Sequence, residues 1–494
     1  MKNEMKQVLA SARERLRLHA DKTHPVIDIT WKPYMDENYQ VEYVRVTMGL
    51  TAPGVVAGGS LVRLWDQVAS IPRSVFTDEG VLAEDEVGPL ALTEDVLTDC
   101  SGFPERHWRP KRDTVGDVVL TYRFYPREVP ADYHFRPYYD FRNEKFGATG
   151  SGVTSLVAPA EREYHIYIHW DLSETPTDTR AVSIRSEGDH DFIGSTEDYR
   201  FTMYAVGKVK SASSDDGRAN VYWLSEPMPD GERMTANTVK VIAAMESFFR
   251  DDETRYSVFF RKDPFKYSNG ATAFANGFIY GYSDEMPLQW DRAMDIIAHE
   301  IVHTWPMLMD RPGLEGEGTW YHEGTAEWYN IKILRQLGFT DEKFTAQQIS
   351  WRGLEYYANE FNRTPNTEAF KAAWTERHAQ WLPYGRGFFY LAEVDMQLRE
   401  KSGGEKCIDD LVWELLERKK SQGPQTVEDW AELIRRELGE PAVDRFRRIS
   451  NGEYIEPDER WFGGQYTFHM GKVYEPVRGT RANSYVWEWK GQAR

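Results

Sequence analysis

Cysteine is scarce in this chain, whose 494 residues include only Cys100 and Cys407. Two cysteines so far apart in the sequence do not make a disulfide framework, which excludes the small disulfide-rich scaffolds of secreted proteins. Reduced cysteines are typical of the cytoplasm. We therefore predict a cytoplasmic protein.

Long hydrophobic runs are also missing. No apolar stretch approaches the roughly 18 residues that a membrane-spanning helix requires, so we expect no membrane partner. The N-terminal residues alternate charged and short apolar side chains without a continuous apolar segment. This pattern predicts an amphipathic surface helix over residues 1–23 rather than a secretory signal.

Positive charge is in short supply. The chain has 60 Lys and Arg against 79 Asp and Glu, a formal net charge of −19, and it contains no basic run. A polyanion would be repelled by such a surface. The sequence therefore predicts no nucleic-acid partner.

The candidate catalytic side chains are concentrated between residues 290 and 330. His299, Glu300 and His303 form the pattern H-E-x-x-H. Residues four apart lie on one face of a helix, and an apolar surface followed by Pro306 predicts that this helix is buried and stops after Trp305. The two imidazoles can share one zinc ion, and Glu300 beside them can serve as the base that activates water.

A catalytic zinc ion needs a third protein ligand. Glu323, on a second predicted helix, is the best candidate, and Glu327 one turn later is expected to accept a hydrogen bond from a ligating histidine. His322 is a rival ligand. Adjacent helical positions point about 100° apart, so at most one of His322 and Glu323 should face the metal. We predict one Zn²⁺ per chain.

Two other patterns are interpreted as structural. His165 and His169 lie four apart in a predicted strand, which places them on one face but about 13 Å apart, too far to share a metal ion. The acidic residues 77–99 are interpreted as a solvated loop.

The overall pattern predicts a multidomain α+β protein. Apolar residues make up 41% of the chain and aromatic residues 14%, enough for several cores. β-branched and aromatic runs predict a β-sandwich-like N-terminal domain over residues 24–234. Residues 235–340 are predicted to form a thermolysin-like zinc-binding catalytic domain, 341–460 an α-helical region that completes the active site, and 461–494 a β-like tail.

Three phrases carry a family resemblance: HEIVHTW at residues 299–305, WYHEGTAEWY at 320–329 and PYGRGFFY at 383–390. They resemble the glycyl aminopeptidase family of gluzincin zinc metallopeptidases, which are relatives of the aminopeptidase N group. The resemblance extends through most of the chain. It implies that His299, His303 and Glu323 bind zinc, that Glu300 is the general base, and that Tyr384 donates a hydrogen bond to the oxyanion.

A β segment precedes the zinc helix. In thermolysin-like folds an edge strand at this place binds the substrate backbone by β-augmentation, and the residues placed for this role are Asn269, Gly270, Ala271, Thr272 and Ala273. An ordinary hairpin is the alternative interpretation.

The same segment departs from the family. The aminopeptidase relatives carry a glutamate there that is expected to hold the free amine of the substrate, whereas NGATAFANG contains no acid. Glu315, Glu317, Asp284 and Glu285 are possible substitutes, and the sequence does not choose among them.

The sequence therefore predicts a zinc-dependent metallopeptidase, an aminopeptidase-type hydrolase that cleaves peptide or peptide-like amide bonds in a small peptide or amino-acid-derived substrate with zinc-activated water. One alternative is a zinc-dependent hydrolase or biosynthetic enzyme acting on a small non-peptide substrate, which the missing acid favours. A second is a non-catalytic, metal-stabilised binding protein. Glu300 argues against the latter, because a structural zinc needs no unligated carboxylate beside it.

Overall fold

A seven-stranded sheet is the largest element of the N-terminal half in the computed structural model, which describes residues 2–19, 23–98, 103–130, 132, 137–227, 230–265, 269–284 and 290–491. Its strands, in spatial order, are β15 (His190–Gly194), β13 (Tyr164–Trp170), β1 (Val26–Met35), β2 (Val41–Leu50), β10 (Val118–Phe124), β6 (Leu82–Asp85) and β7 (Gly88–Leu90). The β1–β13 pair is parallel and the other pairs are antiparallel. In β13, Tyr164, Ile166 and Ile168 are buried and alternate with more exposed residues, as expected for a strand with one face on a core.

The chain divides into two compact units. The N-terminal unit comprises Met1–Val239 and Glu253–Leu288, and the C-terminal unit comprises Lys240–Asp252 and Gln289–Arg494. Helix α3 (Gly231–Phe249) contributes to both. The first unit is rich in strands and the second in helices, as the sequence predicts.

Further sheets complete the N-terminal unit. A four-stranded sheet has the order β11 (Arg142–Glu144), β12 (Gly147–Ser151), β16 (Met203–Gly207) and β14 (Arg180–Ser183). A five-stranded sheet has the order β17 (Lys210–Ser213), β18 (Ala219–Trp223), β19 (Tyr256–Lys262), β21 (Gly277–Tyr282) and β20 (Asn269–Phe274). Smaller sheets pair β3 (Val62–Trp65), β9 (Pro104–Pro110) and β8 (Leu92–Thr98), and β4 (Gln67–Val68) with β5 (Ile71–Pro72). Trp31 is fully buried among aromatic rings that include Phe124 and Tyr204.

The prediction of a solvated loop at residues 77–99 is wrong. This segment forms β6, β7 and β8, and residues 93–98 of β8 are nevertheless exposed. Pairing with β9 supplies the backbone hydrogen bonds of β8, so the strand forms without burying its side chains. Acidic composition therefore indicated exposure correctly for β8 but not for Asp85 in β6, which is fully buried, and it indicated secondary structure incorrectly.

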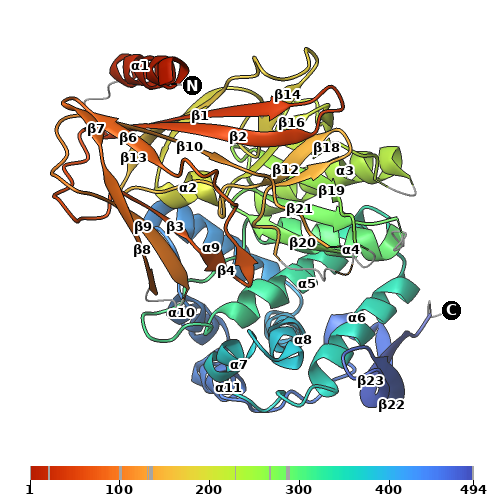
Figure 1. Cartoon of the computed structure of the whole chain (residues 1–494). Coiled ribbons are helices and arrows are strands. Elements are labelled where there is room, and N and C mark those ends of the chain that lie inside the picture. The colour runs from red at the N-terminus through yellow and green to blue at the C-terminus, as the bar shows by residue number, and fades with distance from the viewer. Residues whose placement is uncertain are drawn as a thin grey trace. The chain divides into compact units, whose positions relative to one another are not determined.

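The N-terminal helix α1 (Lys2–Leu18) lies along β1 and β2 (Figure 1). Its residues Leu9, Ala12 and Leu16 recur at helical spacing and are buried. Gly49 of β2 makes room for this contact, since a Cβ there would lie 3.3 Å from the Leu16 side chain. A short helix, α2 (Thr196–Arg200), also belongs to this unit.

Helices dominate the C-terminal unit. They are α4 (Trp290–Val302), α5 (Thr319–Gln336), α6 (Glu342–Tyr357), α7 (Asn366–Ala372), α8 (Arg377–Ser402), α9 (Ile408–Gln422), α10 (Val427–Leu438), α11 (Glu440–Ser450) and the 3₁₀ turn η1 (Trp461–Gly464). A final hairpin of β22 (Tyr466–Glu475) and β23 (Thr480–Trp489) packs against α6. Its Trp487 ring occupies the space over Gly353, where a Cβ would lie only 2.7 Å away.

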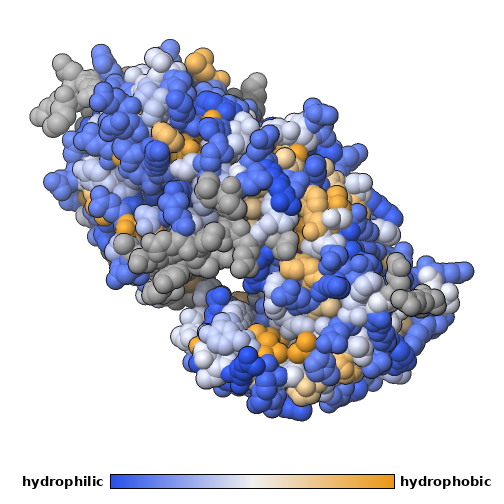
Figure 2. Space-filling view, turned by 90° about the vertical axis from the view of Figure 1, so that its right-hand side faces the viewer, coloured by the Kyte–Doolittle hydropathy of each residue, from blue (hydrophilic) through white to orange (hydrophobic). Residues whose placement is uncertain are grey.

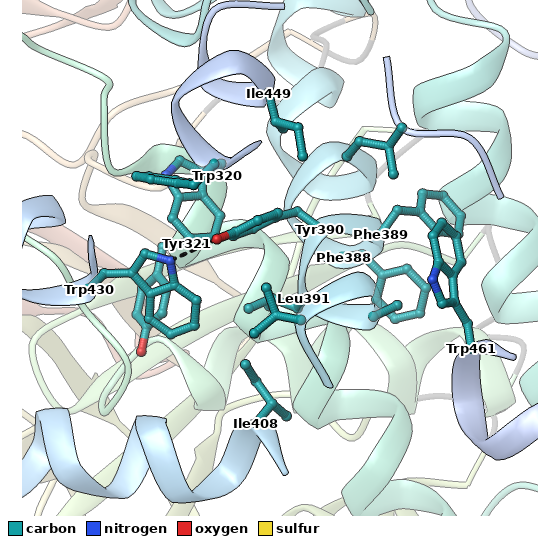
Figure 3. Close-up of a cluster of buried hydrophobic side chains, with 14 of the residues drawn as sticks. Trp320, Tyr321, Phe388, Phe389, Tyr390, Leu391, Ile408, Trp430, Ile449 and Trp461 are labelled. Carbon is teal, nitrogen blue, oxygen red and sulfur yellow. Dashed lines mark hydrogen bonds between the residues drawn. The ribbon is translucent and has the colours of Figure 1, made fainter. Parts of the chain in front are cut away.

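An aromatic cluster forms the core of this unit (Figure 3). Trp320, Tyr390 and Trp430 pack together, and the indole Nε1 of Trp430 donates a hydrogen bond of 3.1 Å to the Tyr390 hydroxyl. The donor of a buried indole is thereby satisfied. This core fixes α5, α8 and α10 against one another.

Helices α5 and α8 approach closely at a pair of glycines. A Cβ built on Gly324 would lie 2.6 Å from the Cα of Gly387, and one built on Gly387 would lie 1.9 Å from the carbonyl oxygen of Trp320. No side chain fits at either position, so glycine is required for this contact. The contact holds the N-terminal half of α5, which carries Glu323, close to Tyr384 of α8.

The molecular surface is mainly hydrophilic on the face in Figure 2, with hydrophobic residues in small separate patches. Among the helices that the structure describes, none combines the length and the hydrophobicity needed to cross a lipid bilayer.

Candidate metal centre and active site

Helix α4 carries His299 and Glu300 near its C-terminal end. Its apolar residues Ile297, Ala298 and Ile301 are fully buried and hold this end in the core. The helix ends at Val302, earlier than the predicted stop, and the chain continues in a tighter turn in which the Trp305 amide donates to the Val302 carbonyl. His303 lies in this turn and still faces His299.

Three side chains converge on one point. The Nε2 atoms of His299 and His303 are 3.1 Å apart, and Oε2 of Glu323 lies 3.2 Å from the first and 3.7 Å from the second. Ligands at about 2.0–2.1 Å from a tetrahedral zinc ion lie about 3.3 Å from one another. The two imidazole planes are almost perpendicular, at 85°. Their in-plane lone pairs can thus meet at one ion, and the donor set fits zinc.

The charges at this site also favour a cation. Burial opposes a charge on His299, but Glu327 and Glu323 outweigh it and raise the histidine pKa well above its ordinary value. Burial lowers the pKa of His303 to about 4, so this imidazole is neutral at pH 7. A neutral imidazole is the form that ligates a metal. The carboxylates of Glu323 and Glu327 therefore favour a positive charge at this site, which a divalent ion would supply.

Glu300 is half-buried beside the ligands. Burial raises the pKa of its carboxyl to about 7. A nearby cation favours the ionised form and lowers this pKa. The side chain is thus suited to exchange a proton near neutral pH.

Behind His299 lies a chain of buried charges. Oε1 of Glu327 is 2.9 Å from Nδ1 of His299, and the same oxygen contacts the guanidinium of Arg352 on α6. Arg352 also lies 3.1 Å from Glu355 and 3.7 Å from Asp295. Burial opposes ionisation of Glu327, but Arg352 and His299 hold its pKa below the ordinary value. Glu327 can therefore keep the His299 proton on Nδ1 and leave Nε2 for a metal.

Tyr384 of α8 lies against His299. The two rings are nearly parallel, at 8°, with centroids 5.4 Å apart. Burial raises the pKa of the Tyr384 hydroxyl well above its ordinary value. The hydroxyl is therefore protonated at neutral pH and can donate a hydrogen bond.

The rival ligand His322 points away from the place where His299, His303 and Glu323 converge. Its Nε2 lies 2.8 Å from the carbonyl oxygen of Leu308. Adjacent positions of α5 thus face different directions, as helical geometry requires, and Glu323 is the one that faces the histidines.

The four acids considered for amine binding differ in their surroundings. Glu317 is buried and forms an ion pair with Arg311 through contacts of 2.8 Å. Its carboxylate is therefore already occupied by a structural partner. Glu315 is exposed in the turn before α5. Asp284, in the N-terminal unit, pairs with Lys262 at 2.8 Å. Glu285 lies outside the described residues.

The predicted substrate-binding residues 269–273 lie in β20. This strand is at one edge of the five-stranded sheet and pairs with β21. The amide of Tyr138 donates a hydrogen bond of 3.0 Å to the Thr272 hydroxyl. The position at an edge meets the requirement for β-augmentation, and the role in substrate binding stays a prediction.

A cavity of about 190 Å³ adjoins the candidate ligands. It is lined by Glu323 and Tyr384, by Trp320 on α5 and by Phe370 on α7. Gly316 has a φ of +84°, and a Cβ there would lie 2.2 Å from the Phe370 side chain, so glycine allows this ring to pack. Among the described residues that line this ligand-side cavity, Glu323 is the only charged one.

A second group of two histidines and a carboxylate occurs in the N-terminal unit. It consists of His19, Asp28 and His169. Oδ2 of Asp28 is 2.9 Å from Nδ1 of His19 and 3.3 Å from Nε2 of His169. His165 lies apart from this group and pairs with Asp191 at 2.8 Å. As the strand spacing predicts, His165 and His169 have different partners.

Sequence reasoning missed Arg352 and Asp295. Both are charged residues in helices, and no local pattern distinguishes them from exposed ones. Their burial follows from the packing of α6 against α4 and α5. Full burial of an Arg among three carboxylates is a tertiary feature, for which a single sequence carries no signal.

No protein-family model and no curated protein sequence matches this chain. Among solved structures it is similar to an aminopeptidase N family protein from Idiomarina loihiensis, with a TM-score of 0.67 at 15% identity over 91% of this chain and 80% of that one. It is also similar to an M1 zinc metallopeptidase from Deinococcus radiodurans bound to a Tyr-Ser-Ala substrate (TM-score 0.51, 13% identity, 88% and 95% coverage) and to yeast LTA4 hydrolase (TM-score 0.53, 13% identity, 90% and 70% coverage). The chain therefore has the fold of M1 aminopeptidases, and the predicted fold class is confirmed.

Proposed function

We propose that this protein is a zinc-dependent metallopeptidase of the aminopeptidase type, related to the glycyl aminopeptidase group. The observation that carries the proposal is the convergence of His299, His303 and Glu323 with Glu300 beside them. A similar fold in proteins described as zinc metallopeptidases supports it. The substrate would be a small peptide or an amino-acid derivative.

His299, His303 and Glu323 would hold one zinc ion per chain. A zinc ion so held supplies Lewis acidity, which polarises a carbonyl group and lowers the pKa of water to about 7. Glu300 takes a proton from the attacking water and passes it to the leaving amine. General acid–base catalysis of this kind contributes about 10²- to 10⁴-fold in rate.

Other side chains would stabilise the transition state and orient the metal ligand His299. Tyr384 donates its hydroxyl hydrogen to the oxygen on which negative charge develops, an interaction strongest in the transition state. Glu327 holds His299 in the tautomer that leaves Nε2 free, and Arg352 keeps Glu327 ionised and in place. The edge of β20, residues 269–273, would bind the extended substrate backbone.

A small non-peptide substrate is the second candidate. It is favoured by the absence of an acid in β20 and by the Arg311 pairing of Glu317, which together leave no established partner for a free amine in the described residues.

Matched substrates distinguish the two candidates. The zinc-loaded protein should hydrolyse aminoacyl-amides, lose this activity on chelation and regain it with zinc. An aminopeptidase should cleave the free-amine form at least 10-fold faster than its N-acetylated form. Equal rates would exclude recognition of a free amine, and no cleavage of either would favour the non-peptide substrate.

A further inference from the structure

A larger cavity lies in the C-terminal unit, separate from the candidate metal ligands. Its volume is about 510 Å³, and it is lined by α5, α6, α8 and the segment 462–466. Cavities of about 300–1,000 Å³ are typical of small-molecule sites. This second cavity is lined by residues that follow Gly324 in α5 and Gly387 in α8, whereas the ligand-side cavity is lined by residues that precede them.

Aromatic rings form one wall of the second cavity. Trp328 and Phe388 lie with centroids 5.8 Å apart, and Phe462 stacks on Phe388 at 5.5 Å. Phe462 has a φ of +55°, a left-handed conformation that is unfavourable for a non-glycine residue. Gly463 and Gly464 continue this conformation. The backbone is thus held in an unfavourable shape that places an aromatic ring on the cavity wall.

Cations line the same cavity. Lys332 and Arg335 follow Trp328 along α5, and Arg399 follows Phe388 along α8. Asp395 is the only acid among the lining residues that the structure describes. Lys332 is already paired with Asp409 outside the lining, so Arg335 and Arg399 are the cations that can meet a ligand.

The cations keep capacity for another anion. Arg335 pairs with Glu342 at 3.2 Å, and both side chains are 37% exposed. Exposed ion pairs of this kind are weak, so a bound anion can compete for the guanidinium. Arg399 pairs with Asp395 through Nε, and its two terminal amino groups offer further donors.

We propose that the second cavity binds a small amphiphilic carboxylate. Its apolar body would lie against Trp328, Phe388 and Phe462, and its carboxylate would meet Arg335 and Arg399. Planar guanidinium groups suit carboxylates because they can donate two parallel hydrogen bonds. From Trp328 to Arg335 α5 rises about 10 Å, which accommodates a medium-length chain. This binding is independent of the proposed hydrolytic function.

Three probes with the same apolar chain test the charge requirement: decanoate, decanol and decylamine. Titration calorimetry on the full-length protein should find one decanoate site per chain, at least 10-fold tighter than decanol, with decylamine weakest. Equal affinity for decanoate and decanol, or no binding up to the solubility limit of decanoate, would overturn the proposal.

Variants of the lining locate the site. Ile331→Trp fills the cavity and should weaken decanoate and decanol alike by at least 10-fold. The double variant R335Q/R399Q should weaken decanoate by at least 10-fold and leave decanol unchanged, and it does not depend on how the core tolerates a larger residue. Lys343→Gln, at an exposed position of α6 outside the lining, is the matched control and should bind like the wild type. Unchanged decanoate binding in R335Q/R399Q would place binding elsewhere.

Discussion

Two groups of two histidines and one carboxylate occur in the described part of the chain, one in each unit, and their rings are oriented differently. His299 and His303 meet at 85°, whereas His19 and His169 are stacked at 13° with centroids 5.2 Å apart. Nearly parallel stacked rings direct their in-plane lone pairs along lines that do not converge. The first group therefore has the ring orientation that suits a shared ion, whereas the second is arranged around the carboxylate of Asp28.

The charges that surround the two groups also differ. Arg15 lies 3.2 Å from Asp28, so the N-terminal group already contains a permanent cation. At the C-terminal group, Glu327 adds negative charge behind His299, and its cationic partner Arg352 contacts Glu327 on α5 from α6. Residue types alone do not distinguish a metal site from an ion-pair cluster, but ring orientation and surrounding charge do.

The largest effect should come from Glu300. Glu300→Gln removes the proton acceptor and keeps the shape, so the turnover rate should fall by about 10³-fold while zinc content is unchanged. Glu432→Gln, the same change at an exposed position, is the control. Peptide hydrolysis and metal analysis on the same samples measure both quantities. Undiminished turnover in Glu300→Gln would refute its role as base.

Tyr384→Phe should have the next largest effect. Loss of an oxyanion donor costs about 10²- to 10³-fold in kcat, and KM should change little if the hydrogen bond forms only in the transition state. Tyr474→Phe, at a position that is 60% exposed, is the control. A loss confined to KM would instead assign Tyr384 to substrate binding.

A smaller effect is expected from the charges behind His299. Glu327→Gln should lower zinc affinity by about 10- to 100-fold, measured by competition with a chelator. Arg352→Met should lower it less. Because Arg352 acts through Glu327, the double variant should bind zinc as Glu327→Gln does. Additive losses would mean that Arg352 influences the metal by another route.

The N-terminal group should respond to pH rather than to zinc. Hydrogen bonding to Asp28 raises the His169 pKa above 6.5, so its contribution to stability is complete below pH 6.5 and is lost as pH rises through the raised pKa. Burial of Asp28 opposes a charge, but His169 and Arg15 hold its pKa below 3.8, so its contribution is complete above pH 3.8 and is lost at lower pH.

His169→Ala should therefore lower the free energy of unfolding most between pH 3.8 and 6.5, by about 1–3 kcal/mol. Zinc content and turnover should not change. Thermal unfolding at pH 5 and pH 9 measures the difference, and an equal loss at both pH values would contradict the charged pairing.

Sequence patterns predict the contacts between residues that lie only a few positions apart in the chain. His299 and His303 face each other because four residues make about one helical turn, and Glu327 follows Glu323 by the same rule. The strands of the N-terminal unit show the alternation that β13 illustrates. In each case the relevant contact is set by local geometry.

Contacts between distant segments could not be predicted in this way. Arg352 reaches Glu327 only because α6 packs beside α5, and β8 forms only because β9 pairs with it. The second cavity depends on Phe462, far from α5 in sequence. Such features arise from tertiary packing, and they include the interactions that tune the site.

Zinc content tests the contrast between the two groups most directly. We expect one zinc ion per chain in the wild type and in His169→Ala, and none in the double variant H299A/H303A, all purified under the same conditions and measured by elemental analysis. Retention of zinc by H299A/H303A, or loss of zinc from His169→Ala, would contradict the assignment of the metal centre to the C-terminal unit.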